Sequence, residues 1–81
     1  MVREYARVRR MRLLMLMLAR GRALTLAQIR WLTERDPILS PCHLRGDLVA
    51  LLELGLVTRC SGSGKPPDYA ASLAARRTLR P

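Results

Sequence analysis

Apolar residues recur at helical spacing along the first twenty residues of the chain. They form one stripe with gaps of three or four positions, which is typical of an amphipathic helix. The stripe consists of Val8, Met11, Met15 and Leu18. We therefore predict a helix from about Glu4 to Arg20, ended by Gly21 because glycine readily takes the left-handed conformation after a helix.

The second half of this helix is apolar around nearly its whole circumference. Leu13, Leu14, Leu16 and Met17 fill the sides that the stripe leaves open. Burial in the core of one small domain would cover only part of this surface. We expect a homodimer in which Leu13, Leu16 and Met17 face the second copy, and burial of the whole helix in its own core is the alternative.

A second helix is predicted after a capping box. Thr25 is followed three residues later by Gln28, so each side chain can satisfy a free backbone donor of the other. Leu26, Ile29 and Leu32 form the buried stripe, and Asp36-Pro37 ends the helix, because a residue before proline avoids helical geometry. Trp31 lies outside this stripe, so we expect it at a partner surface or at the edge of the core.

A third helix is predicted from Ser40 as N-cap, with Pro41 at the first helical position and Leu39 packed on Leu44. Its remaining inward residues are leucines, and a glycine closes it. These residues are Leu48, Leu51, Leu52 and Gly55.

Two short strands are predicted after this helix. Residues 56–60 are β-prone, residues 61–68 form a loop rich in glycine and proline, and residues 69–73 return as the second strand. The whole chain, 1–81, is thus predicted to be one domain, mostly α with a small β-hairpin: three helices and a two-stranded wing. Residues 1–7 and 76–81 are expected to be frayed basic ends.

Charge points to a polyanionic partner. Fifteen lysines and arginines stand against six acidic residues, which gives a net charge of +9, and 49% of the 81 residues are hydrophobic. Such a composition argues against disorder and favours nucleic acid as the partner. The longest apolar run, 13–19, is too short to cross a bilayer, so we expect no membrane association, no targeting segment and a cytoplasmic protein.

Metal binding and catalysis are not expected. The soft metal ligands are Cys42, His43 and Cys60. The first two are adjacent and diverge on a helix, whereas a structural zinc normally has four ligands. Neither a catalytic set of side chains nor a glycine-rich phosphate loop occurs, so we predict a non-enzyme without cofactors.

The order of helix, helix, helix, strand, loop and strand resembles that of a winged helix-turn-helix domain. The pattern Leu48-x-x-Leu51-x-x-x-Gly55-Leu56-Val57-x-Arg59 resembles the end of the recognition helix and the first wing strand of MarR-, PadR- and ArsR-like bacterial regulators. Residues 68–72 resemble a degraded form of the strand that returns from the wing. The resemblance covers about residues 8–73.

This resemblance implies a DNA-binding transcriptional regulator of bacterial or phage type, associated with the nucleoid. Helix 40–54 would enter the major groove of double-stranded DNA, and the wing, 56–73, would contact the backbone. The implied base contacts are His43, Arg45 and Gly46, and the implied phosphate contacts are Arg59, Lys65, Arg30, Arg76 and Arg77. A homodimer would suit paired half-sites.

The outward face of the third helix has few residues that read bases. It is expected to carry Cys42, His43, Gly46, Val49, Ala50 and Glu53, with Arg45 and Asp47 on its flanks. Because Arg, Lys, Asn and Gln make most base-specific contacts, only Arg45 qualifies fully. Two alternatives follow: a protein-interaction module that uses Val49, Ala50 and Leu54, and a non-specific architectural DNA binder.

A dense basic cluster lies at the N-terminus. It consists of Arg3, Arg7, Arg9, Arg10 and Arg12. It is interpreted either as an arm that contacts DNA or as an ordinary solvated helix face, since both have this composition.

Overall fold

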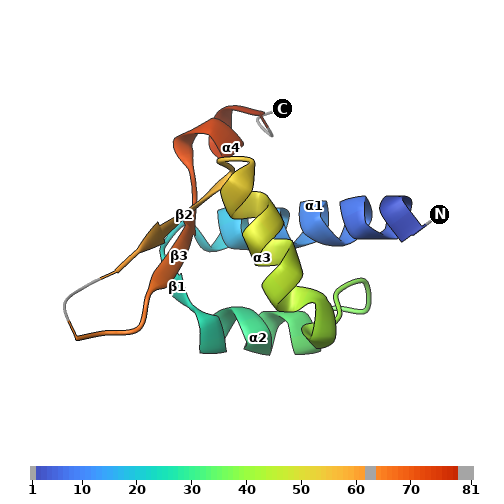
Figure 1. Ribbon diagram of the computed structural model, residues 1–81, viewed down its shortest axis with the longest axis horizontal. Coiled ribbons are helices and arrows are strands. Elements are labelled where there is room, and N and C mark those ends of the chain that lie inside the picture. The colour runs from blue at the N-terminus through green and yellow to red at the C-terminus, as the bar shows by residue number, and fades with distance from the viewer. Residues whose placement is uncertain (1, 62–63, 79–81) are drawn as a thin grey trace.

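The computed structural model describes residues 2–61 and 64–78 and is mostly helical, with a small antiparallel sheet (Figure 1). The helices are α1 (Val2–Arg20), α2 (Leu26–Glu34), α3 (Leu44–Glu53) and α4 (Leu73–Thr78), and a 3-10 turn, Pro41–His43, precedes α3. The strands are β1 (Leu24–Thr25), β2 (Val57–Cys60) and β3 (Asp68–Ala71).

The sheet has the strand order β1-β3-β2, and both pairings are antiparallel. Val57 lies opposite Ala71 and Cys60 opposite Asp68, so the predicted hairpin is present. Leu24 lies opposite Tyr69, which adds a third strand that was not predicted. A strand of two residues is too short to produce the alternation by which strands are detected. The hairpin extends from one end of the molecule (Figure 1).

The core lies where α1, α2, α3 and the base of the sheet meet. Its buried residues are almost all aliphatic, and they come from α1, β1, α2, α3, β2 and α4, with Leu39 from the loop after α2. They are Leu13, Leu14, Met17, Leu24, Ile29, Leu39, Leu44, Leu48, Leu51, Val57 and Ala75. Tyr69 and Ala71 of β3 pack against this cluster from the sheet.

The orientation of α1 differs from the prediction. Leu13 and Met17 are 1% exposed and belong to the core, and Leu16 is half-buried against it. The assignment of Leu13 and Met17 to a dimer interface is therefore wrong, because their own core encloses both; the half-buried Leu16 neither supports nor contradicts its assignment. Met11 and Met15 of the predicted core stripe are instead 45% and 50% exposed.

Arg9 contributes to this orientation. It lies one turn before Leu13 on the same side of α1 and binds a carboxylate on α3. The side of α1 that faces α3 is thus fixed by polar as well as apolar contacts.

The helix ends follow the sequence signals with one exception. Thr25 Oγ1 accepts a hydrogen bond from the Gln28 N–H at 3.1 Å, and the Gln28 side chain accepts one from the Thr25 N–H at 2.9 Å, which confirms the capping box. Gly21 and Gly55 have φ of 66° and 74° and end α1 and α3 as predicted. Ser40 makes no side-chain capping bond; its Oγ lies 3.0 Å from Sγ of Cys42, and α3 begins only at Leu44.

The C-terminal helix α4 is held by Ser72. The Ser72 hydroxyl donates to the carbonyl of Gly55 at 2.7 Å and accepts from the N–H of Ala75 at 3.1 Å. Residues 76–78 therefore continue a short helix tied to the end of α3, and residues 2–7 belong to α1, so both parts are helical. Met1 and residues 79–81 lie outside the described residues.

Candidate nucleic-acid interface

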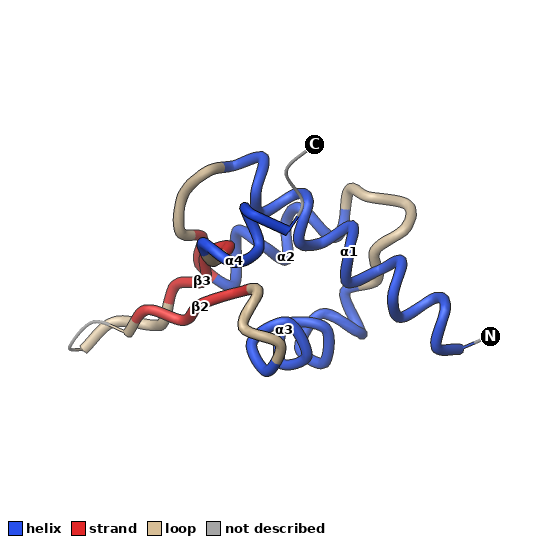
Figure 2. Tube along the Cα trace, turned by 90° about the horizontal axis from the view of Figure 1, so that it is seen from above, coloured by secondary structure: helices blue, strands red, loops and turns tan. Residues whose placement is uncertain are grey.

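Helix α3 lies on one side of the molecule and packs against α1 (Figure 2). Leu44, Leu48 and Leu51 point into the core. The opposite side carries exposed residues from the first turn of the helix to its end. They are Arg45, Gly46, Val49 and Glu53, with His43 exposed just before the helix. The three residues predicted to contact bases, His43, Arg45 and Gly46, are therefore all exposed at the same end of α3.

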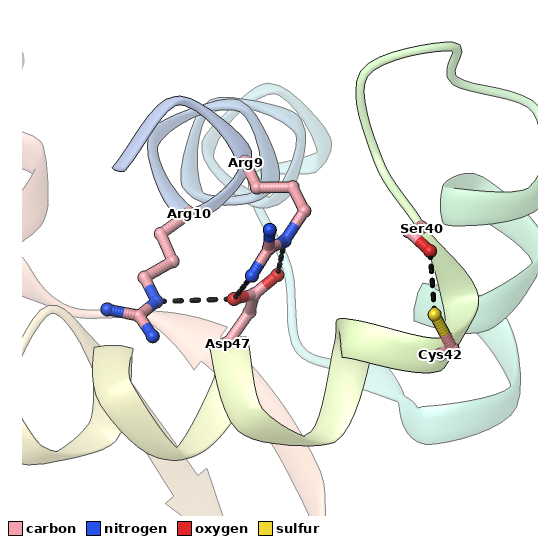
Figure 3. Close-up of polar contacts among 5 residues, drawn as sticks. All are labelled: Arg9, Arg10, Ser40, Cys42 and Asp47. Atoms are coloured by element: carbon pink, nitrogen blue, oxygen red, sulfur yellow. Dashed lines mark hydrogen bonds and ion pairs between the residues drawn. The ribbon is translucent and has the colours of Figure 1, made fainter. Parts of the chain in front are cut away.

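Asp47 does not lie on the flank of this surface as predicted. Its side chain is only 3% exposed and points toward α1 (Figure 3). Arg9 donates to it from Nε at 2.8 Å and from Nη2 at 3.0 Å, and Arg10 donates from Nε at 3.2 Å. The hydrogen bonds to Asp47 raise the pKa of Arg9 above its ordinary value, although burial acts in the opposite direction. Asp47 is thus neutralised inside the fold.

Arg12 is a third arginine of α1 that pairs with an acid. Arg12 Nε donates to Asp36 Oδ2 at 2.7 Å, and the N–H of Ile38 donates to the other oxygen at 3.0 Å. Burial raises the pKa of Asp36, but these hydrogen bonds and the charge of Arg12 outweigh it, so the pKa is lowered overall.

The N-terminal basic cluster is therefore largely structural. Arg9, Arg10 and Arg12 bind acids on other parts of the chain, which fits neither a DNA-contacting arm nor a merely solvated face. Arg7 is exposed, and the side chain of Arg3 lies outside the described side chains.

The residues predicted to contact phosphate are exposed on three elements. Arg30 lies on α2, Arg59 and Lys65 on the hairpin, and Arg76 and Arg77 on α4. Among the described residues, none of these five cations forms an ion pair. Side chains alternate along a strand, so Arg59 lies on the same sheet face as the buried Val57. These positions leave all five charges available to a partner.

Trp31 is half-exposed on α2, on the side away from the core. The guanidinium of Arg35 stacks 3.7 Å from the centre of its ring. Beside it lies a shallow hollow of about 320 Å³, lined by Arg20, Arg22 and Leu24 among others. The sequence prediction that Trp31 leaves the buried stripe is confirmed.

The described residues contain no group of three or more His, Cys, Asp and Glu side chains that could hold a metal ion. Cys42 and Cys60 are both free and exposed. None of the helices, as far as they are described, has the length and apolar character needed to cross a membrane.

Comparisons of the chain with protein-family models, curated proteins and solved structures found no match.

Proposed function

We propose that this protein binds double-stranded DNA as a winged helix-turn-helix domain and acts as a transcriptional regulator of bacterial or phage type. In this proposal α3 enters the major groove, and the β2–β3 hairpin contacts the sugar-phosphate backbone. The order of the elements supports it, since a helix and a short strand precede α2, α3 and a hairpin that pairs with that strand.

The main support for the proposal is that Asp47 is buried and paired with arginines of α1. A carboxylate on a helix that enters a groove would repel phosphates, and α3 has two. Asp47 is turned inward and neutralised by Arg9 and Arg10, so Glu53, in the last turn, is the one acid left on the outward face of α3. The N-terminal end of α3, where His43 and Arg45 are exposed, is also the positive end of the helix dipole.

Gly46 supports a close approach of DNA to this turn. A methyl group added at this position would meet no atom within 4 Å, the chain neighbours and the helix's own backbone aside. Glycine inside a helix costs about 1 kcal/mol relative to alanine, and nothing in the packing requires it here. The absence of a side chain therefore leaves space in which a partner can lie against the helix backbone.

Phosphate contact would come from the hairpin and from α2. Arg59, Lys65 and Arg30 are exposed and unpaired among the described residues, and such contacts position a protein on DNA without reading sequence. Arg76 and Arg77 add charge on α4. Because Arg45 is the single strong base-reading side chain on α3, we propose modest sequence specificity.

Fluorescence anisotropy with labelled duplexes tests this proposal. The titration compares random-sequence DNA with DNA from upstream of the protein's own gene across a salt series. We expect tight binding at low salt that weakens steeply as ionic strength rises, because phosphate contacts release counterions. Absence of binding to either duplex at low salt would contradict the proposal.

A second candidate function is favoured by the apolar part of the same helix. Val49 is 47% exposed on α3, and Leu54, directly after the helix, is 68% exposed. These side chains suit a protein partner that covers the end of α3. In that case Val49→Ser and Leu54→Ser would abolish binding of the partner, and the anisotropy titration would show no DNA binding.

A further inference from the structure

The side of α1 that points away from the core is an apolar surface without a partner. Val8, Met11 and Met15 are between 45% and 52% exposed, and Ile38, from the loop after α2, is 48% exposed. Together with Arg7 and Arg12 they line an open groove of about 690 Å³. We call Val8, Met11, Met15 and Ile38 the outer face of α1.

Little net charge remains at this face, although the chain as a whole carries +9. Arg9 and Arg10 are turned toward Asp47, and Arg12 is neutralised by Asp36 at 2.7 Å. Arg7 is the one cation that lines the groove without an acidic partner among the described residues. Two molecules of the same charge sign can approach each other at such a place, whereas a polyanion gains little there.

The apolar residues of the outer face have the spacing found where two helices pack against each other. Val8, Met11 and Met15 are separated by three and four residues, and the half-buried Leu18 continues the series. Gaps of three and four keep such side chains in line against a second helix. A single helix face is complementary to itself when two copies meet across a two-fold axis, and the flexible methionines adapt to such a contact.

We infer that a second copy of this chain packs on the outer face of α1, with the two α1 helices side by side around a two-fold axis. The contact would be centred on residues 8–15 of α1 and on Ile38 of each copy.

This interface differs from the one expected from the sequence, and it leaves α3 uncovered. Helical geometry places Val8, Met11 and Met15 opposite Leu13, Met17 and the Asp47 contact. In Figure 2, α3 and the loop that carries Ile38 accordingly lie on opposite sides of α1. The dimer would direct its two α3 helices away from each other.

Sedimentation velocity of the full chain without DNA, over a micromolar-to-millimolar series, tests the inference independently of the proposed function. We expect a dimer that the single substitutions Met11→Glu and Val8→Glu each convert to a monomer. Both positions are exposed, so the circular dichroism spectrum should stay unchanged and show that the variants fold. Val49→Glu, which places the same charge at an equally exposed apolar position on α3, is the matched control and should remain a dimer.

Two results would overturn the inference: a monomer of the unmodified chain throughout the series, or a dimer that persists in folded Met11→Glu and Val8→Glu. Loss of the dimer in Val49→Glu alone would likewise exclude α1 and assign the contact to α3. DNA binding by the monomeric Met11→Glu chain separates the two proposals, because that variant should still bind a single duplex through α3.

Discussion

Arg9 of α1 and Asp47 of α3, 38 residues apart in sequence, form a bidentate ion pair. Arg9 Nε lies 2.8 Å from Asp47 Oδ2, and Arg9 Nη2 lies 3.0 Å from Asp47 Oδ1. The pair joins the helix that holds the core to the helix proposed to contact DNA. It also removes a negative charge from that contact surface. Asp47 thus serves both stability and the proposed function.

Replacing Asp47 by alanine should lower the free energy of unfolding by about 2–3 kcal/mol, because two partly buried guanidinium groups lose their acceptor. Urea denaturation followed by circular dichroism measures this loss. Glu53→Ala, which removes an exposed acid from the same helix, should change stability by less than about 0.5 kcal/mol. Equal effects of the two substitutions would show that the Asp47 pair adds little.

Stability should fall in acid as Asp36 becomes protonated. The pKa of Asp36 is lower in the folded chain than its ordinary value of 3.8, so its carboxylate stabilises the fold at pH above that value. This contribution is lost as pH falls through the folded pKa. Thermal melts between pH 2 and 7 should therefore show a smaller acid-dependent decrease for Asp36→Asn than for the unmodified chain, and identical profiles would contradict the assignment.

Gly46→Ala should separate stability from function. The added methyl group has open space around it and removes the helix cost of glycine, so the free energy of unfolding should rise by up to about 1 kcal/mol. The same methyl group should weaken DNA binding, because it prevents close approach to the helix backbone. A more stable variant with unchanged affinity in the anisotropy titration would remove Gly46 from the proposed contact.

The hairpin cations should control the dependence of binding on salt. Arg59→Gln and Lys65→Gln should each reduce the slope of log affinity against log salt by about one unit, with the same loss on every DNA sequence. Arg7→Gln removes another exposed charge, from the groove at the outer face of α1, and should leave the slope unchanged. A similar decrease in all three variants would indicate general attraction without a defined contact surface.

Arg45→Ala should act on sequence preference. A bidentate contact between arginine and guanine distinguishes bases by about 1–3 kcal/mol, so the ratio of specific to random-sequence affinity should fall while the salt slope changes little. Competition titrations with unlabelled duplexes measure this ratio. An unchanged ratio would remove α3 as the element that reads sequence.

Local signals in the sequence predicted most of the elements. The capping box of Thr25 and Gln28, the terminal glycines Gly21 and Gly55, and the inward leucines of α3 were all predicted correctly, because each acts over a few residues. Ser40 was the exception, since a 3-10 turn follows it and displaces the start of α3 to Leu44.

The orientation of α1 could not be predicted in this way. Both sides of its second half are apolar, so periodicity alone did not distinguish the core face from the exposed one. The core face is set by contacts with residues distant in sequence, among them the contact between Arg9 and Asp47. Asp47 does carry a signal, since it lies three residues after Leu44 and four before Leu51, on the buried side of its helix, where an acid needs a partner.

The opposite placement of α3 and the outer face of α1 has a consequence for how DNA would be engaged. A dimer joined back to back cannot lay both recognition helices on neighbouring half-sites of one straight operator. It would instead hold one duplex on each side and draw two DNA segments together. Under both proposals the protein would bridge two DNA segments. Binding of the dimer would then depend less on the spacing of two sites along one duplex than on whether the two segments come close together.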